Sequence, residues 1–187
     1  MDISRACLLP GWMTEGELTY LADAASRSTC IAEIGSWRGR STRAMADNTS
    51  GMIYAIDTWA DDAYGYPGWW TTPEDTAKRS TKDWLWKEFS SHLNGSLHTK
   101  VFPMRMHSVE AAVILSRYMK FDMIFIDADH EEKSVREDIL AWRPLLRAGG
   151  LFCGHDYNHP TCPGVKVAVD ALIPNVEITE TIWHATF

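Results

Sequence analysis

The distribution of apolar and polar residues predicts alternating strands and helices along most of the chain. Short apolar runs suited to buried strands occur at residues 30–34, 52–56, 99–106, 121–126 and 151–154. Amphipathic stretches lie between them and predict helices. This alternation, with polar residues at the strand ends, is typical of an α/β fold with a Rossmann-like, doubly wound sheet and helices on both faces. We expect the sheet to be mostly parallel, with residues 176–187 adding an antiparallel edge strand.

The segments outside this alternation have different character. Residues 1–29 hold one predicted helix, about 14–26, with Thr14 as N-cap and Glu17 at the capping-box position. Residues 58–94 are irregular and rich in aromatic side chains, and a helix is predicted from Pro73 to about residue 93. Crowded aromatic residues suit either a lid over an organic substrate or an oligomer interface, and both alternatives stay open.

Composition limits the classes of function. At 187 residues the chain is predicted to be one domain, with 45% hydrophobic and 23% charged residues as in an ordinary globular protein. The net charge of -7 gives no broad basic surface for nucleic acid or an anionic membrane. No apolar run approaches the ~20 residues of a membrane span. With four cysteines and no visible signal peptide, we expect a cytoplasmic protein with reduced thiols.

The stretch from residue 30 to residue 57 carries the first functional motif. A strand ends at Gly35, a loop leads to Gly39 and a helix, and a second strand closes at Asp57, 22 residues after Gly35. A carboxylate at that position binds ribose hydroxyls in nucleotide-binding folds. Trp37 stands where a dinucleotide fingerprint needs its second glycine, which argues against NAD or FAD and for an adenosyl ligand without phosphates.

This motif, E-x-G-x-x-x-G, resembles the first motif of the class I S-adenosylmethionine-dependent methyltransferases. The resemblance implies that Glu33, Gly35 and Gly39 border the methionine part of the cofactor and that Asp57 binds its ribose. The corner at His107 lies near the adenine in that family, although a surface histidine explains this residue more simply. The full cofactor site implied by the resemblance is Glu33, Gly35, Ser36, Gly39, Asp57, Thr58, Trp59, His107, Ser108, Asp127 and Asp129.

Two polar clusters follow neighbouring predicted strands. Asp127, Asp129 and His130 come after the strand at 121–126, and His155 and Asp156 come after the strand at 151–154. Because a crossover connection returns the chain to the same sheet edge, these side chains can converge on one cleft. Carboxylates with an imidazole suit a divalent cation that keeps positions open for substrate oxygens. The alternative is that the residues cap helices and solvate loops.

The sequence around these clusters narrows the resemblance. Cation-dependent sugar and macrolide O-methyltransferases and cephalosporin-hydroxylase-type proteins carry sequences similar to three segments of this chain: FDMIFIDADHEEKSVREDIL, LLRAGGLFCGHDY and PGVKVAVD. The similarity to catechol and caffeoyl-CoA O-methyltransferases is more distant. With the first motif, the resemblance covers roughly residues 28–173. It implies that Asp127, His155 and Asp156 bind magnesium, that His130 is the general base, and that Asp129 supports cofactor or substrate.

One position departs from that pattern. Relatives usually carry a carboxylate where this chain has His155, and an imidazole there favours manganese, iron or zinc over magnesium. It can also mean that no metal binds and that His155 is itself a base. A rival set, Cys153, His155, His159 and Cys162, has the ligand types of a structural zinc, but Cys153 is expected inside a buried strand.

The sequence therefore predicts O-methyl transfer from S-adenosylmethionine to a hydroxylated small molecule, assisted by a divalent cation and a histidine base. The first alternative is a metal-independent methyltransferase acting on nitrogen or a carboxylate, with His130 or His155 as base. The second is a non-catalytic adenosyl-binding or assembly module. The exposed aromatic residues and the resemblance favour a homo-oligomer.

Overall fold

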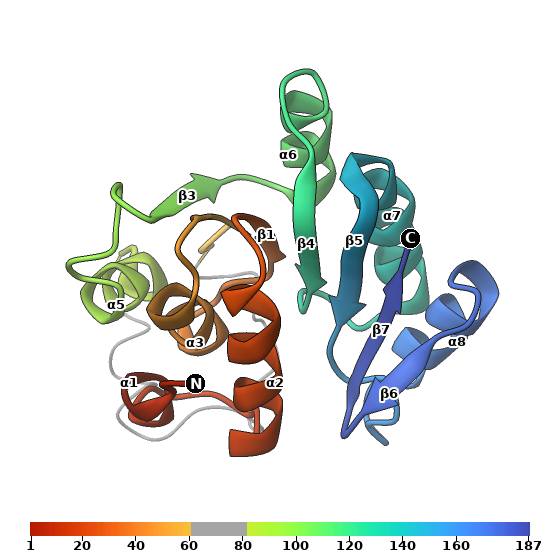
Figure 1. Ribbon diagram of the computed structural model, residues 1–187, viewed down its shortest axis with the longest axis horizontal. Coiled ribbons are helices and arrows are strands. Elements are labelled where there is room, and N and C mark those ends of the chain that lie inside the picture. The colour runs from red at the N-terminus through yellow and green to blue at the C-terminus, as the bar shows by residue number, and fades with distance from the viewer. Residues whose placement is uncertain (61–81) are drawn as a thin grey trace.

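The computed structural model describes residues 1–60 and 82–187. At its centre is a seven-stranded sheet with the order β3-β2-β1-β4-β5-β7-β6 (Figure 1). The strands are β1 (Cys30–Ile34), β2 (Met52–Asp57), β3 (Val101–Arg105), β4 (Phe121–Ile126), β5 (Leu146–Gly154), β6 (Glu177–Thr179) and β7 (Ile182–Thr186). Strands β1 to β5 pair in parallel, whereas β7 runs antiparallel to both β5 and β6. The expected Rossmann-like sheet with an antiparallel edge is confirmed.

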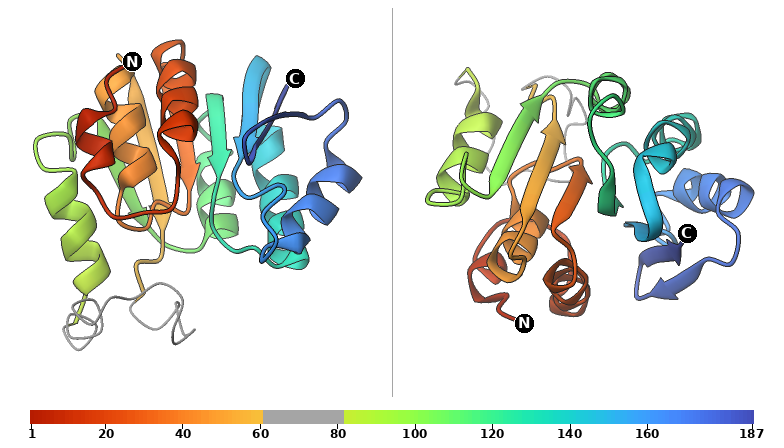
Figure 2. Two further views of the ribbon diagram at one scale, coloured as in Figure 1. Left: turned by 90° about the horizontal axis from the view of Figure 1, so that it is seen from below. Right: turned by 45° about the horizontal axis from the view of Figure 1, so that its top comes forward.

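The helices cover both faces of this sheet (Figure 2). They are α1 (Ser4–Cys7), α2 (Glu15–Ser26), α3 (Arg40–Asn48), α5 (Trp84–His92), α6 (Ser108–Leu115), α7 (Glu132–Trp142), the 3-10 turn η1 (Arg143–Leu145) and α8 (Pro163–Leu172). Helices α1, α2, α3 and α5 pack on one face, and α6, α7 and α8 pack on the other. Successive strand residues point to opposite faces of the sheet. Ile31 packs in the core beneath α1, α2, α3 and α5, and Ala32 packs in the core beneath α6, α7 and α8.

Local signals were sufficient for several of these elements. Helix α2 has the predicted capping box: the Glu17 backbone N–H donates to Thr14 Oγ1 at 3.1 Å, and the Thr14 N–H donates to Glu17 Oε2 at 2.9 Å. Ser108, with Glu110 two residues later, predicts an N-cap for α6, but this prediction is wrong because the N-cap is His107. The Ser108 hydroxyl instead donates to Asp138 and accepts from Trp142 Nε1.

Strand β5 is longer than the sequence pattern predicted. It begins at Leu146, so residues 148–150 lie within the strand, which was predicted only for 151–154. The register against β4 shifts between Phe121 and Met123, and Gly149 adopts a φ of +77° that favours glycine. Because the strand begins irregularly and contains two glycines, its first residues do not show the alternation of apolar and polar positions that predicts a strand.

The aromatic region is described only in part. Residues 61–81, which include most of the predicted lid or interface and the predicted helix start at Pro73, lie outside the described residues. Within the described part, α5 begins at Trp84, and Trp84 and Phe89 are buried in the core. No helix of the described ranges is long and apolar enough to cross a membrane.

The strand order places a ligand-binding crevice. From β1 the chain winds outward through β2 to β3, and from β4 it winds the other way through β5. Open α/β sheets bind ligands at the carboxyl ends of the strands where this reversal occurs. The loops that follow β1 and β4 carry Gly35 and Asp127, so both predicted motifs meet at the reversal point.

Candidate active site

The loop after β1 needs both of its glycines. Gly35 has a φ of +88°, and a Cβ there would lie 2.0 Å from the backbone oxygen of Asp127. Gly39 has a φ of +86° and stands at the N-cap of α3, where a Cβ would lie 2.3 Å from Leu93 Cδ2. Side chains at these positions would combine a disfavoured backbone conformation with steric overlap. Gly35 therefore lets the loop lie directly against the end of β4, and Gly39 lets it pack against the end of α5.

Glu33 is hydrogen-bonded to this loop and to the start of α3. Its side chain is fully buried, and its carboxylate accepts hydrogen bonds from the hydroxyls of Ser36 at 2.7 Å, Ser41 at 2.6 Å and Thr42. Burial raises the pKa of Glu33 to about 7, although the three hydroxyl hydrogen bonds act in the opposite direction. Its predicted contact with the methionine part of a cofactor stays a prediction.

Asp57 joins the loops that follow β1 and β2. Its Oδ2 accepts from the Trp37 N–H at 2.8 Å, and its Oδ1 accepts from the Trp59 N–H at 2.7 Å. Both tryptophans have a φ of +42°, an uncommon conformation for bulky residues, and Asp57 stabilises each of them. The predicted bonds from Asp57 to ribose hydroxyls stay a prediction.

The remaining predicted cofactor residues lie around the same edge. Trp59 is fully buried against Trp86 and Phe89, and its Nε1–H donates to the Trp37 backbone oxygen at 2.7 Å. Its indole therefore belongs to the core, and any contact with a cofactor is limited to its backbone. Thr58 is half-buried beside it, and His107 is exposed at the start of α6.

The three predicted metal-binding side chains converge after β4 and β5. The ligand atoms of Asp127, His155 and Asp156 all lie within 4.8 Å of one another. His155 Nδ1 is 3.2 Å from Asp156 Oδ2 and 3.6 Å from Asp127 Oδ1. Asp156 has a φ of +62°, a conformation that costs energy for a non-glycine residue and that aims its carboxylate from a tight turn.

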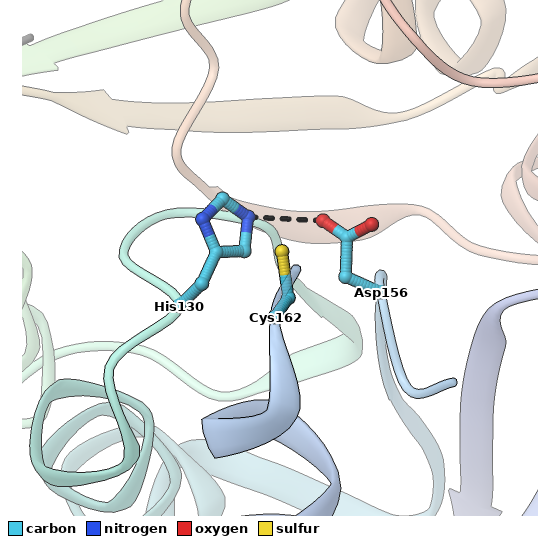
Figure 3. A group of neighbouring side chains, drawn as sticks. All are labelled: His130, Asp156 and Cys162. Atoms are coloured by element: carbon cyan, nitrogen blue, oxygen red, sulfur yellow. Dashed lines mark ion pairs between the residues drawn. The ribbon is translucent and has the colours of Figure 1, made fainter. Parts of the chain in front are cut away.

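His130 faces the same carboxylates from the loop after β4. Its Nε2 lies 2.9 Å from Asp156 Oδ2 and 4.0 Å from Asp127 Oδ1, and its side chain is 35% exposed (Figure 3). Burial lowers the pKa of His130, but the hydrogen bond to Asp156 and the charge of Asp127 outweigh burial and raise the pKa above its ordinary value. This imidazole is therefore accessible and oriented by a carboxylate.

Asp129 does not join the cluster. It is exposed, and its two carboxylate oxygens accept from the Glu131 N–H at 3.1 Å and from the Ser134 hydroxyl at 2.7 Å. These bonds satisfy groups in the first turn of α7, where a negative charge is also favourable. Asp129 therefore makes local hydrogen bonds at the start of α7, and its predicted support of cofactor or substrate stays a prediction.

Glu17 is a member of the cluster that sequence reasoning missed. Its Oε2 lies 3.2 Å from His155 Nε2, and its Oε1 accepts from the Thr181 N–H at 3.2 Å. The side chain is only 2% exposed. Burial raises the pKa of Glu17, but the contacts with His155, Thr181 and the Thr14 N–H lower it to about 2. The capping-box signal identified Glu17 as a helix-start residue and carried no sign of this long-range contact.

His155 is consequently surrounded by carboxylates on both sides of its ring. Burial lowers its pKa, but the charges and hydrogen bonds of Asp127, Asp156 and Glu17 raise it far above the ordinary value of an imidazole. Burial raises the pKa of Asp156, but its contacts with His130 and His155 outweigh burial and lower it. The cluster therefore carries concentrated negative charge around a buried ring.

The donor set at this position fits a divalent cation. Two carboxylates and one imidazole nitrogen are ligands for manganese, iron and zinc, and the carboxylates alone suit magnesium. The alternative zinc ligands Cys153 and His159 do not come together in the described structure. Cys153 is fully buried in β5, where its Sγ donates to the Ile124 backbone oxygen at 3.5 Å, whereas His159 is exposed.

Comparisons with known proteins agree with this architecture. The profile of the methyltransferase domain family matches residues 32–157. The comparison with curated protein sequences gave no match. Among solved structures, one from Klebsiella pneumoniae, provisionally assigned as an O-methyltransferase, is 18% identical with a TM-score of 0.69, covering 98% of this chain and 85% of its own.

Two further structures share the fold. The O-methyltransferase from Bacillus cereus in complex with S-adenosylhomocysteine is 17% identical with a TM-score of 0.65, covering 99% of this chain and 87% of that one. The methyltransferase MycE of the mycinamycin pathway, in complex with Mg, S-adenosylhomocysteine and mycinamycin VI, is 17% identical with a TM-score of 0.60, covering 94% and 50%. Because the family profile spans most of the sheet and both motifs, this chain belongs to the methyltransferase domain family, which confirms the class of S-adenosylmethionine-dependent methyltransferases expected from its sequence.

Proposed function

We propose that this protein transfers a methyl group from S-adenosylmethionine to a hydroxyl oxygen of a small molecule, with a divalent cation held by Asp127, His155 and Asp156 and with His130 as general base. One observation carries the proposal: these four side chains meet at the edge of the sheet that also holds the Gly35 loop. The Bacillus cereus and MycE structures support it, since both contain S-adenosylhomocysteine and MycE also contains Mg.

The residues at the ends of β1 and β2 would hold the methyl donor. S-adenosylmethionine supplies an activated methyl group on a sulfonium, so the protein has mainly to align donor and acceptor. The loop from Gly35 to Gly39 offers backbone close to the end of β4, where the methionine part would lie. Asp57 would accept hydrogen bonds from the ribose hydroxyls, and the start of α6 at His107 would border the adenine.

The residues at the ends of β4 and β5 would act on the acceptor. A bound cation would supply positive charge that lowers the pKa of the acceptor hydroxyl. His130 would accept the hydroxyl proton at Nδ1, because its Nε2–H faces the Asp156 carboxylate, and its side chain is partly exposed while Asp127 and Asp156 lie deeper. Asp156 would hold the imidazole in place and stabilise its charged form.

The identity of the cation depends on His155. Magnesium is the ion implied by resemblance, but its preference for oxygen ligands makes an imidazole a weak partner. Manganese accepts both carboxylate and imidazole ligands, and we propose it as the better fit to this donor set. The negative charge of the chain favours a small-molecule acceptor over a nucleic acid.

One observation favours a second candidate function. Because both ring nitrogens of His155 lie within ion-pair distance of carboxylates, a doubly protonated imidazole would balance part of their negative charge without any metal. His155 would then supply the positive charge beside the acceptor, and the protein would be a metal-independent methyltransferase. Full methyl transfer by chelator-treated protein would favour this candidate over the first.

Calorimetric titration separates these candidates. Metal-stripped protein is titrated with S-adenosylhomocysteine, and the titration is repeated with magnesium and with manganese. The proposal expects cofactor binding in the micromolar range and a separate heat for the metal that is lost in Asp156→Ala. Asp127→Asn should abolish turnover and leave cofactor binding nearly intact. Unchanged turnover in Asp127→Asn would remove the metal role, and absence of cofactor binding in every condition would overturn the proposal.

A further inference from the structure

A second group of side chains, His130, Asp156 and Cys162, overlaps the proposed metal cluster through Asp156. Each contributes one ligand atom, and these atoms lie within 4.8 Å of one another. Figure 3 shows the His130 ring and the Asp156 carboxylate facing each other, with the sulfur of Cys162 beside them. Cys162 is 6% exposed, so its thiol lies inside the molecule and points toward this group from the start of α8.

The backbone holds these three residues together. The first turn of α8 packs tightly on the loop after β4, because a Cβ at Gly164 would lie 2.5 Å from the His130 backbone oxygen. The turn after β5 is equally fixed: the His159 N–H donates to the Asp156 backbone oxygen at 3.2 Å, and the Cys162 N–H donates to the His159 oxygen at 3.0 Å. The group is therefore built from three connected backbone segments.

The donor types select a class of metal ion. A thiolate, an imidazole and a carboxylate are the ligands of zinc and of cobalt as its substitute, whereas magnesium and calcium prefer oxygen alone. Two ligands of one tetrahedral zinc ion lie roughly 3.3–3.6 Å apart, given bond lengths of about 2.0–2.3 Å. The 2.9 Å between His130 Nε2 and Asp156 Oδ2 is near this range. The other separations in the group are at most 4.8 Å, so the excess over this range is no more than about 1 Å, which a change in the Cys162 side-chain torsion can close.

The unequal burial of the three side chains leaves one side of the group open to solvent. Cys162 and Asp156 lie on the inner side of the group, while the His130 side chain is 35% exposed. An ion can therefore enter from the His130 side and keep a water as its fourth ligand. Three protein ligands with one open position are the arrangement of an exchangeable zinc site, in contrast to the closed four-residue arrangement of structural zinc.

We propose that His130, Asp156 and Cys162 form a zinc site whose occupation inhibits methyl transfer. On binding, the Cys162 thiol releases its proton to solvent and its sulfur bonds the ion, while the lone pair of His130 Nε2 becomes a ligand. His130 then cannot accept a proton, and Asp156 is withdrawn from Asp127 and His155. The inhibitory consequence rests on the proposed role of His130 as base, whereas the zinc site itself does not.

Cobalt titration tests the site without any activity measurement. Metal-free protein is titrated with Co²⁺, and the near-ultraviolet band of a thiolate–cobalt bond is recorded, followed by displacement with Zn²⁺. The expected result is a band in wild type and in Cys7→Ser, whose thiol lies elsewhere in the chain, with no band and at least tenfold weaker zinc binding in Cys162→Ser. An unfolding transition checks that each variant is folded. A wild-type protein without the band, or a Cys162→Ser protein that keeps it, would overturn the site.

Inhibition is measured separately on the methyl-transfer reaction. With manganese present, zinc should inhibit wild type and Cys7→Ser at concentrations at least tenfold lower than Cys162→Ser, whose activity without zinc should match wild type. Equal zinc inhibition of all three proteins would refute the inhibitory role. A protein that shows the cobalt band but transfers no methyl group would contradict the proposed function and leave the zinc site standing.

Discussion

Glu17 and His155 form a buried contact between helix α2 and the end of strand β5, with 3.2 Å between Glu17 Oε2 and His155 Nε2. Because Nε2 faces Glu17, Nδ1 is the ring nitrogen that faces Asp127 and Asp156. A carboxylate behind a ligating imidazole fixes its orientation and tautomer and raises its basicity. Glu17 thereby determines which nitrogen His155 presents to the proposed cation.

This arrangement predicts that Glu17→Gln weakens metal binding. The amide keeps an oxygen for the Thr14 N–H, but it loses the charge that stabilises His155. We expect manganese affinity to fall ten- to a hundredfold, with binding of S-adenosylhomocysteine unchanged, as measured by calorimetric titration. Glu15→Gln is the matched control, since Glu15 lies in the same helical turn but is exposed. Equal losses in the two variants would contradict the orienting role of Glu17.

The approach of Gly35 to Asp127 predicts a steric penalty that can be separated from backbone strain. Gly35→Ala and Gly95→Ala both place a methyl group at a positive φ, +88° and +83°, but a Cβ at Gly95 has no atom within 4 Å. Gly95→Ala should cost about 1–2 kcal/mol in the free energy of unfolding from strain alone. Gly35→Ala should cost at least about 2 kcal/mol more, because the Asp127 backbone must move. Urea unfolding measures both, and equal losses would argue against the close contact.

Features that depend on residues close together in the sequence could be predicted, whereas contacts between distant segments could not. Thr14 and Glu17 were predicted as a capping box because that pattern is local, and the β1 loop was predicted because glycine spacing and the strand-end carboxylate lie within 30 residues or so of each other. The contact of Glu17 with His155 has no local signature, since it exists only after α2 packs beside the end of β5. The same holds for Cys162, whose neighbours His130 and Asp156 come from the loops after β4 and β5.

The buried carboxyl of Glu33 predicts an unusual pH dependence of stability. Burial raises its pKa from 4.5 to about 7, so the folded state holds this proton more tightly than the unfolded state. The resulting stabilisation is present below pH 4.5 and is lost as the pH rises toward 7, by roughly 3 kcal/mol in total. Glu33→Gln lacks this titration. Its free energy of unfolding relative to wild type should therefore increase between pH 4.5 and 8, as followed by urea unfolding at each pH, and a constant difference would contradict the assignment.

The contact between His130 and Asp156 predicts how methyl transfer depends on pH. His130 must be neutral to act as base, and the carboxylates around it raise its pKa above 6.5 in the metal-free protein. A cation on Asp127 and Asp156 neutralises those carboxylates, so magnesium should lower the His130 pKa, which NMR titration of the ring protons can follow. The rate should rise with pH through the pKa of the metal-bound form. His130→Gln should lower kcat by about 10²–10⁴-fold, remove this rise and leave binding of S-adenosylhomocysteine unchanged. If the same rise persists in His130→Gln, another group is the base, and His155 becomes the candidate because it is the other imidazole that contacts Asp156.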